Sequence, residues 1–132
     1  MLLTSVYEEA GAPEVLYALL GEREPYQAIS HKTMPTRGEH QSFVGSVPYA
    51  AWYLIKVDGE DVGAVYLTHK REVGLFIFKA HQSKGYGSKA LALVREKHPG
   101  TMYANISVRN PSSKAFFERH GFTHIQNTLV ST

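Results

Sequence analysis

The chain has 132 residues, of which 43% are hydrophobic and 20% are charged, with a net charge of +2 and no cysteine. This length and balance predict a single globular domain over residues 1–132 and argue against a disordered chain. The absence of cysteine excludes disulfides, thiolate nucleophiles and Cys-ligated zinc, and the small positive charge gives no reason to expect a nucleic-acid partner. No apolar stretch approaches the ~20 residues that span a bilayer, and the first residues lack the pattern of a signal peptide. We therefore expect a cytoplasmic protein with no membrane partner.

The N-terminal third of the chain predicts two helices. Residues 13–20 repeat apolar side chains at helical spacing, with Pro13 in the first turn. Thr36 and Glu39 have the spacing of a capping box, which predicts the start of a second helix at this point. The connection between the two helices, residues 21–35, is polar, and we expect it to be irregular.

The middle of the chain predicts a sheet. Residues 51–57, 62–68 and 73–78 are rich in aromatic and β-branched side chains and are separated by short polar turns. Such short connections predict an antiparallel meander of three strands. The third run is apolar without alternation, which is typical of a strand buried on both faces at the centre of a sheet.

The C-terminal part of the chain alternates helices and strands. Residues 88–97 predict a helix and residues 103–108 a strand, which would run parallel to the strand before that helix. Asn110 is placed to cap a last helix, with Pro111 at its first position, and residues 122–130 predict a last strand. The order of elements predicts a mixed α/β domain.

A glycine-rich turn joins the third predicted strand to the helix that follows it. Gly85 and Gly87 lack a Cβ, so the backbone can turn sharply there and approach a ligand closely. The first N–H groups of the following helix have no partner within the helix, and this arrangement binds phosphate groups. Lys84 and Lys89 would add positive charge. The spacing matches neither a P-loop nor a dinucleotide-binding fingerprint.

Two motifs in this region resemble those of the GNAT superfamily of acetyl-CoA-dependent N-acetyltransferases. The segment Gln82-x-x-Gly85-x-Gly87 is similar to the pyrophosphate loop of that family, [RQ]-x-x-G-x-[GA]. The segment Asn110-x-x-Ser113-x-x-Phe116-Phe117-Glu118-x-x-Gly121-Phe122 resembles the helix that follows one strand later. The resemblance implies a three-layer sandwich, in which helices cover both faces of a mixed central sheet that is splayed at the cofactor cleft.

The resemblance also implies which residues bind acetyl-CoA. The backbone of the third strand would pair with the pantetheine arm like an added strand, and the backbone N–H of Ile77 would polarise the thioester carbonyl. The glycine-rich loop would hold the pyrophosphate, and Asn110 would contact the cofactor as well as cap its helix. The residues expected at the cofactor are Leu75, Phe76, Ile77, Gln82, Ser83, Lys84, Gly85, Tyr86, Gly87, Ser88, Asn110 and Phe117.

Two catalytic groups that are common in this family have no counterpart here. Phe117 stands where related enzymes often have a tyrosine that protonates the leaving thiolate, and Asn105 stands where some have a glutamate base. Glu72 and Tyr103 are the first candidates to replace them, because strand positions can face the cleft. Each also has a simpler interpretation, as an exposed turn residue and a core residue. Further candidates are Tyr66, His81 and Ser107.

The predicted function is transfer of an acetyl group from acetyl-CoA to a primary amine. Glu39-His40-x-x-Phe43 resembles acetyltransferases that act on amino-sugar nucleotides or on ribosomal-protein N-termini, so the acceptor could be a small molecule, including an amino sugar, or a protein N-terminus. The histidines show no metal-ligand spacing, and we expect no metal site. The sequence is compatible with a monomer or a homodimer. The alternative function is an acetyl-CoA-binding module that senses or interacts without efficient catalysis.

Overall fold

The computed structural model describes residues 1–22 and 34–132. Within these residues the strands are β1 (Leu2–Ser5), β2 (Ala51–Val57), β3 (Glu60–Leu67) and β4 (Val73–Ile77). The α-helices are α1 (Ala12–Gly21), α2 (Arg37–Gly45), α3 (Tyr86–Lys97) and α4 (Pro111–Arg119), and two short 3-10 helices are η1 (Val6–Glu8) and η3 (Lys79–His81). Most of the connection predicted to be irregular, residues 21–35, lies outside the described residues. No described helix is long and apolar enough to cross a membrane.

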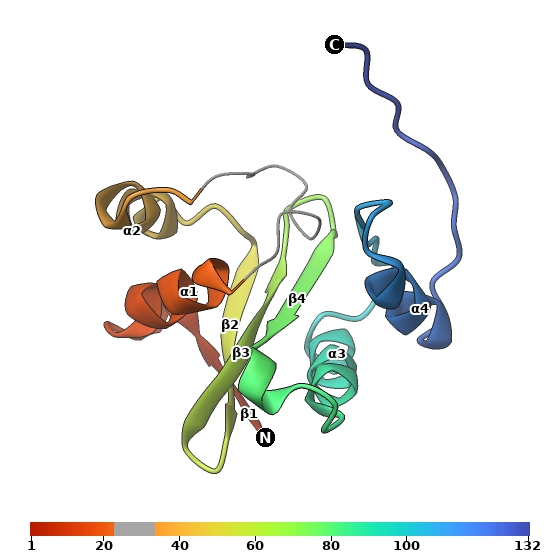
Figure 1. Cartoon of the computed structure of the whole chain (residues 1–132). Coiled ribbons are helices and arrows are strands. Elements are labelled where there is room, and N and C mark those ends of the chain that lie inside the picture. Colours follow the sequence, from red (N-terminus) through yellow and green to blue (C-terminus); the bar gives the residue numbers. More distant parts are fainter. Residues whose placement is uncertain (23–33) are drawn as a thin grey trace.

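The strands form one four-stranded antiparallel sheet in the order β1-β2-β3-β4 (Figure 1). In this sheet Leu54 of β2 pairs with Ala64 of β3, and Val65 of β3 pairs with Leu75 of β4. The predicted antiparallel meander is thus confirmed. The sequence interpretation did not anticipate β1, which pairs with β2 along its whole length.

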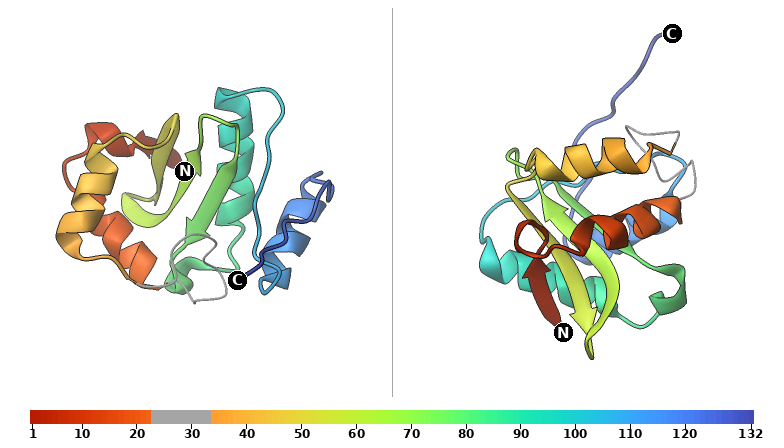
Figure 2. Two further views of the ribbon diagram at one scale, coloured as in Figure 1. Left: turned by 90° about the horizontal axis from the view of Figure 1, so that it is seen from above. Right: turned by 90° about the vertical axis from the view of Figure 1, so that its left-hand side faces the viewer.

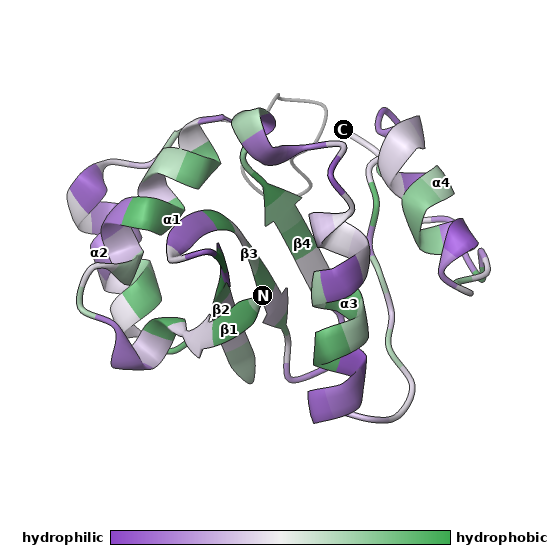
Figure 3. Ribbon diagram, turned by 90° about the horizontal axis from the view of Figure 1, so that it is seen from below, coloured by the Kyte–Doolittle hydropathy of each residue, from purple (hydrophilic) through white to green (hydrophobic). Residues whose placement is uncertain are grey.

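Helices cover both faces of the sheet (Figure 2). On one face, α1 and α2 bury Leu16, Leu19 and Val44 in a cluster with Trp52 and Leu54 of β2. On the other face, buried side chains of α3 and α4 join a second cluster with residues of β2, β3 and β4, among them Ala90, Leu91, Val94 and Phe117. In Figure 3, α3 shows apolar residues next to hydrophilic ones, as expected of a helix with one buried face. The fold is therefore a mixed α/β fold with the sheet between two helical layers.

Both predicted helix caps are present. The Thr36 hydroxyl accepts the backbone N–H of Glu39 at 3.1 Å, and the Glu39 carboxylate accepts the backbone N–H of Thr36 at 2.8 Å, which completes a capping box. The Asn110 side chain accepts the backbone N–H of Ser113 at 3.2 Å, and Pro111 opens α4. These local bonds satisfy N–H groups that have no partner within the helix, so α2 and α4 begin where the sequence predicts.

The two predicted C-terminal strands are absent from the described structure, so the expectation of a mixed sheet was wrong. Residues 103–108 make a single parallel bridge, between Tyr103 and Glu72. Beyond it, Ala104 and Ile106 pack against the core cluster on the α3 side instead of extending the sheet. Residues 122–130 form no strand either, and residues 123–130 are exposed on a segment that leaves the body of the molecule (Figure 1).

These differences also change the position of β4. The sequence predicts a central strand that is buried on both faces, but β4 lies at the edge of the sheet. Val73 and Gly74 are buried, whereas the side chains of Leu75, Phe76 and Ile77 are half-buried. The apolar run is explained by packing on both faces of the sheet, because Leu75 and Ile77 contact the core cluster on the α3 side and Phe76 contacts the one on the α1 side. Among the described residues, no strand lies beside β4 beyond the bridge at Tyr103.

Candidate active site

The hydrogen bonds of β4 show which of its residues face the open edge of the sheet. The backbone N–H of Thr68 donates to the carbonyl of Glu72 at 2.8 Å, and the N–H of Phe78 donates to the carbonyl of Val62 at 2.9 Å. Alternate residues of an antiparallel strand turn their backbone groups to opposite sides. The even-numbered residues from Glu72 to Phe78 therefore bond to β3, and the odd-numbered residues face outward.

The outward-facing groups begin at Val73, whose N–H donates to the carbonyl of Tyr103 at 2.8 Å. Beyond this bridge, no further backbone bond between β4 and residues 104–108 is found among the described residues. The carbonyl of Ile77 accepts the side-chain amide of Gln82 at 3.0 Å. The N–H and carbonyl of Leu75 and the N–H of Ile77 face the open edge, where no described strand pairs with them. These groups can form hydrogen bonds with an extended ligand.

The loop after η3 brings the start of α3 to the same region. Gly85 is the N-cap of α3, with a φ of 79° that glycine adopts without strain, and no side chain caps the helix. Ser83 has a φ of 64°, in the same left-handed region. Gly85 therefore offers the first N–H groups of α3 no side-chain acceptor, and the positive end of the helix dipole lies behind these groups. This part of the site suits an anionic group.

Gly87 lies where α3 approaches β4 and α4. A Cβ at this position would lie 3.5 Å from Cδ2 of Leu75 and 3.5 Å from Cε2 of Phe116. The first atom of a side chain would therefore fit, and a longer side chain would enter the space between β4 and α4. A glycine here keeps that space open.

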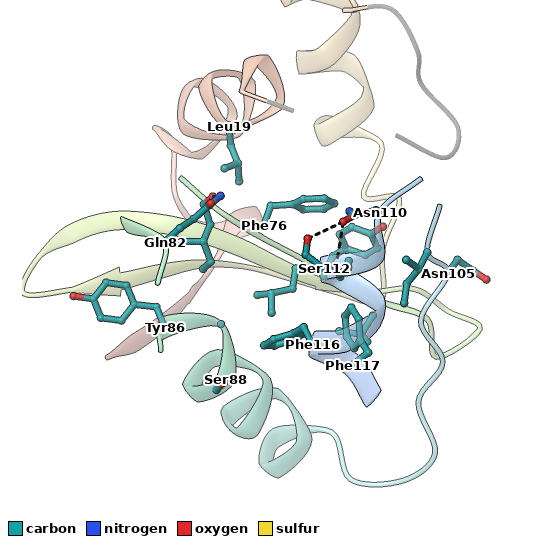
Figure 4. Close-up of a pocket in the computed structure, with 18 of the residues that line it drawn as sticks. Leu19, Phe76, Gln82, Tyr86, Ser88, Asn105, Asn110, Ser112, Phe116 and Phe117 are labelled. Carbon is teal, nitrogen blue, oxygen red and sulfur yellow. Dashed lines mark hydrogen bonds between the residues drawn. The ribbon is translucent and has the colours of Figure 1, made fainter. Parts of the chain in front are cut away.

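These groups line one cavity with a volume of about 780 Å³ (Figure 4). Of the residues expected at the site, the cavity is lined by Glu72, Leu75, Phe76, Ile77, Gln82, Ser83, Gly85, Tyr86, Gly87, Ser88, Asn110 and Phe117. Lys84 and Tyr103 do not line it, and both are exposed. The further candidates Tyr66, His81 and Ser107 do line it.

The carboxylate of Glu72 lies at the end of the cavity where β4 begins. The hydroxyl of Thr68 donates to one carboxylate oxygen at 3.2 Å, and the side-chain amide of Asn105 donates to the other. Asn105, which occupies the position of a glutamate in some related enzymes, thus holds the carboxylate of a residue distant in the sequence. Two donors fix this carboxylate where a ligand in the cavity can reach it.

Within residues 1–22 and 34–132, no three histidine, aspartate or glutamate side chains come together as a metal site would require. Of the histidines, His31 lies outside the described residues. The expectation that the protein has no metal site therefore remains a prediction.

Residues 48–124 match the model of the family described as acetyltransferase (GNAT) domain, which is more than half of the 132 residues. The chain belongs to the GNAT acetyltransferase family. Enzymes of this family are N-acetyltransferases that use acetyl-CoA. No curated protein matches the sequence of this GNAT enzyme.

Solved structures support the fold of this GNAT enzyme. An acetyltransferase from Thermus thermophilus has a TM-score of 0.73 and 22% sequence identity, over 95% of this chain and 86% of that one. A ribosomal-protein-alanine N-acetyltransferase from Brucella melitensis has a TM-score of 0.73 and 16% identity, over 96% of this chain and 86% of that one. A putative acetyltransferase from Salmonella typhimurium, solved with acetyl-CoA, has a TM-score of 0.65 and 18% identity, over 92% and 78% of the two chains.

Several residues at the site of this GNAT enzyme were not predicted from its sequence. Leu19, Tyr49 and Thr68 line the cavity, although the sequence analysis assigned none of them to the site. Thr68 could have been found, because the short turn between β3 and β4 pairs it with Glu72. Nothing in the sequence indicates that Tyr49 reaches the cavity, since it belongs to an irregular segment between α2 and β2.

Proposed function

We propose that this GNAT enzyme transfers the acetyl group of acetyl-CoA to a primary amine by direct attack in a ternary complex. The observation that carries the proposal is the open edge of β4, where the backbone groups of Leu75 and Ile77 face a cavity that continues to the start of α3. An extended, anionic cosubstrate fits this combination of a free strand edge and a helix N-terminus.

The chain offers a place for each part of acetyl-CoA. The outward N–H and carbonyl of Leu75 suit the amides of the pantetheine arm, which would lie along β4 like a short strand. The N–H groups from Gln82 to Ser88 suit the pyrophosphate, and Lys84 adds positive charge from the exposed side of the loop. Phe117 closes the space beside the arm from α4, where its ring lies 5.1 Å from that of Phe116.

We propose catalytic roles for two groups that face the cavity, the backbone N–H of Ile77 and the carboxylate of Glu72. Acetyl-CoA supplies a thioester, whose C–S bond breaks as the acceptor nitrogen bonds to the acetyl carbon. CoA leaves as a thiolate, which takes up the second proton that the nitrogen loses as it becomes an amide. The N–H of Ile77 polarises the acetyl carbonyl, and the carboxylate of Glu72 takes the proton of the incoming ammonium group. The geometry supports Glu72 more than Tyr103, because the side chain of Glu72 lines the cavity and that of Tyr103 does not.

The test of this proposal is CoA release from acetyl-CoA in the presence of amines, measured for the wild type and for Glu72→Gln. We expect Glu72→Gln to lower kcat by about 100-fold or more, since a positioned base contributes that much, and to leave the KM for acetyl-CoA nearly unchanged. Glu96→Gln, an exposed change on α3 outside the cavity, is the matched control and should keep full activity. Wild-type turnover in Glu72→Gln would show that another group is the base.

A further inference from the structure

The turn between β3 and β4 places an arginine where the backbone favours glycine. The N–H of Thr68 donates to the carbonyl of Glu72 at 2.8 Å, and the N–H of Arg71 donates to the carbonyl of Thr68 at 3.0 Å. Residues 69–71 therefore form the hairpin loop, and Arg71 at its end has a φ of 67°, in the left-handed region. A residue with a Cβ is strained in that region, so neighbouring contacts must hold Arg71 in place.

The side chain of Arg71 binds the C-terminal end of α3. Its Nη2 donates to the carbonyls of His98 and Pro99 at 2.8 and 3.1 Å, and its Nε donates to the carbonyl of Thr101 at 3.1 Å. The last carbonyls of a helix have no partner within it and lie at the negative end of the helix dipole, so a guanidinium with several donors suits this place. Arg71 thus ties the β3–β4 turn to the connection that follows α3.

Two residues of this connection accommodate the guanidinium. Gly100 has a φ of 120°, and a Cβ at this position would lie 3.2 Å from Nη2 of Arg71, which is closer than an ordinary contact. The ring of His98 is hydrogen-bonded through Nε2 to the Tyr53 hydroxyl of β2 at 2.7 Å. Burial lowers the pKa of His98, and the charges of Arg71 and Lys97 lower it further. At neutral pH the ring is therefore uncharged and does not repel the guanidinium.

The same connection continues into the segment that contacts Glu72. The N–H of Tyr103 donates to the carbonyl of Arg71 at 2.8 Å, and the N–H of Val73 donates to the carbonyl of Tyr103 at 2.8 Å. Two residues later, the side-chain amide of Asn105 donates to the carboxylate of Glu72. Asn105 is exposed and belongs to the irregular segment between α3 and α4 (Figure 4). The position of its amide therefore depends on how firmly the start of this segment is held.

We infer, on the basis of the proposed function, that Arg71 is a positioning residue for the base Glu72. Arg71 holds the connection after α3 against the β3–β4 turn, and this connection holds the amide of Asn105 on one oxygen of the Glu72 carboxylate. Thr68 holds the other oxygen from the turn itself. A base that is kept in one orientation by two donors takes a proton faster than one that rotates. Arg71 does not line the cavity, so it acts through Asn105 and not on either substrate.

The side-chain amide signals of Asn105 in NMR spectra test the inference without any substrate. These signals are assigned by their loss in Asn105→Ser. In the wild type, the proton bonded to the carboxylate should resonate downfield of free asparagine amides and should shift when Glu72 is protonated. We expect Arg71→Met and Glu72→Gln to lose this downfield shift, and Lys97→Met, which removes a positive charge from the last turn of α3, to keep it. Unchanged Asn105 signals in Arg71→Met would overturn the inference.

Arg71→Gly is a second variant that keeps the turn. Glycine adopts a φ of 67° without strain, so this substitution removes the guanidinium without adding strain to the hairpin loop. We expect the same loss of the Asn105 downfield shift as in Arg71→Met, with the backbone signals of the sheet in place to show that the variant is folded. A folded Arg71→Gly protein that keeps the Asn105 shift would contradict the inference.

A double-mutant cycle tests whether Arg71 acts on the reaction through Glu72. CoA release is measured at saturating acetyl-CoA with the most active of four probes: phenethylamine, spermidine, glucosamine phosphate and a peptide that begins with alanine. We expect Arg71→Met to lower kcat about tenfold, with the KM for acetyl-CoA within about threefold of the wild type, and Lys97→Met to keep both values. In the Glu72→Gln background, Arg71→Met should change kcat less than about twofold, because the base is already absent.

The outcomes of the cycle separate failure of the inference from failure of the proposed function. An equal loss of kcat in both backgrounds, or a wild-type kcat in Arg71→Met beside a low kcat in Glu72→Gln, would overturn the inference alone. Wild-type kcat in Glu72→Gln would overturn the proposed base and this inference with it. If none of the four amines is acetylated, the proposed function fails, and the Asn105 signals still decide whether Arg71 holds the amide on the carboxylate.

Discussion

A substitution at Gly87 tests whether the glycine-rich loop binds acetyl-CoA or only begins helix α3. Its Cβ position faces Leu75 and Phe116 at 3.5 Å, so valine would push two methyl groups into the space proposed for the pantetheine arm. We expect Gly87→Val to raise the Kd for acetyl-CoA at least tenfold, or by about 1.4 kcal/mol, measured by calorimetry.

Gly87→Ala is the control for this prediction, because a single methyl group at 3.5 Å makes ordinary contacts. Its Kd should lie between those of the wild type and the valine variant, and both variants should unfold cooperatively. Equal affinity in all three proteins would mean that the turn only begins α3 and that the cosubstrate binds elsewhere.

His40 makes the stability of the protein depend on pH. Its side chain is 7% exposed, and its Nδ1 atom has no hydrogen-bond partner among the described residues. Burial lowers the pKa of the imidazole, and the nearby charge of Glu14 opposes this only partly. The folded state therefore favours the neutral ring, and the unfolded state binds more protons below its own pKa of about 6.5.

The contribution of His40 to the free energy of unfolding should accordingly be fully present well above about pH 6.5 and be lost as the pH decreases below that value. We expect His40→Leu to reduce this loss, measured by urea unfolding at about pH 7.5 and about pH 5.5. The pKa of His98 is also lowered, mainly by burial, and its contribution should remain in the variant. The same loss of stability in both proteins would assign the pH dependence to groups other than His40.

At the scale of elements, local signals were sufficient for the helices. The capping box of Thr36 and the cap of Asn110 involve residues within one helical turn, so the sequence contains the complete interaction. The glycine-rich loop was predictable for the same reason. Gly85 supplies the left-handed backbone at the start of α3, as its place in the motif indicates.

Strands were less predictable, because a strand needs a partner that is distant in the sequence. Residues 103–108 have the composition of a strand but meet only Glu72, and residues 122–130 pair with no described strand. β1 is four residues long and was missed because its pairing lies with residues 53–56 of β2. The stacking of Tyr49 on Tyr66 was not predicted either, because it depends on the tertiary fold.

Phe117 of helix α4 occupies the position where related enzymes often have a tyrosine. Substitutions of Phe117 therefore test whether catalysis in this protein needs a tyrosine. Phe117 is 6% exposed, and its ring packs against those of Phe116 and Phe122 at 5.1 and 5.0 Å. We expect Phe117→Tyr to leave kcat within a few-fold of the wild type, because a proton donor needs surrounding groups that align it, and the contacts described for this ring are those of a packing residue. Phe117→Ala should weaken acetyl-CoA binding and destabilise the fold by about 3–5 kcal/mol.

Steady-state kinetics of Phe117→Tyr distinguish an active acetyltransferase from an acetyl-CoA-binding module without efficient catalysis. A kcat that rises by about two orders of magnitude in Phe117→Tyr would mean that the natural protein lacks a required acid. The acetyl-CoA-binding module would then be the better account. A kcat near the wild-type value supports an enzyme that works with Phe117 as a packing residue.

At the scale of the whole molecule, both helical layers contribute to one cavity. The layer of α3 and α4 lies beside the glycine-rich loop and the open edge of β4. The layer of α1 and α2 covers the other face of the sheet, where Leu19 and Tyr49 line the same cavity. Glu72 directly precedes β4 and Leu75 lies on it, between the two layers, where we propose that the acceptor and the thioester meet. In the proposed function, β4 would therefore contact both acetyl-CoA and the amine acceptor.

Thermal unfolding in the presence of acetyl-CoA tests the central claim most directly. A ligand at about 100 times its Kd stabilises the folded state by about 2.7 kcal/mol, so saturating acetyl-CoA should raise the Tm by several degrees. CoA should act similarly, and ATP, which has no pantetheine arm to pair with β4, should have a smaller effect. A cooperative transition whose Tm is the same with and without saturating acetyl-CoA would contradict the account.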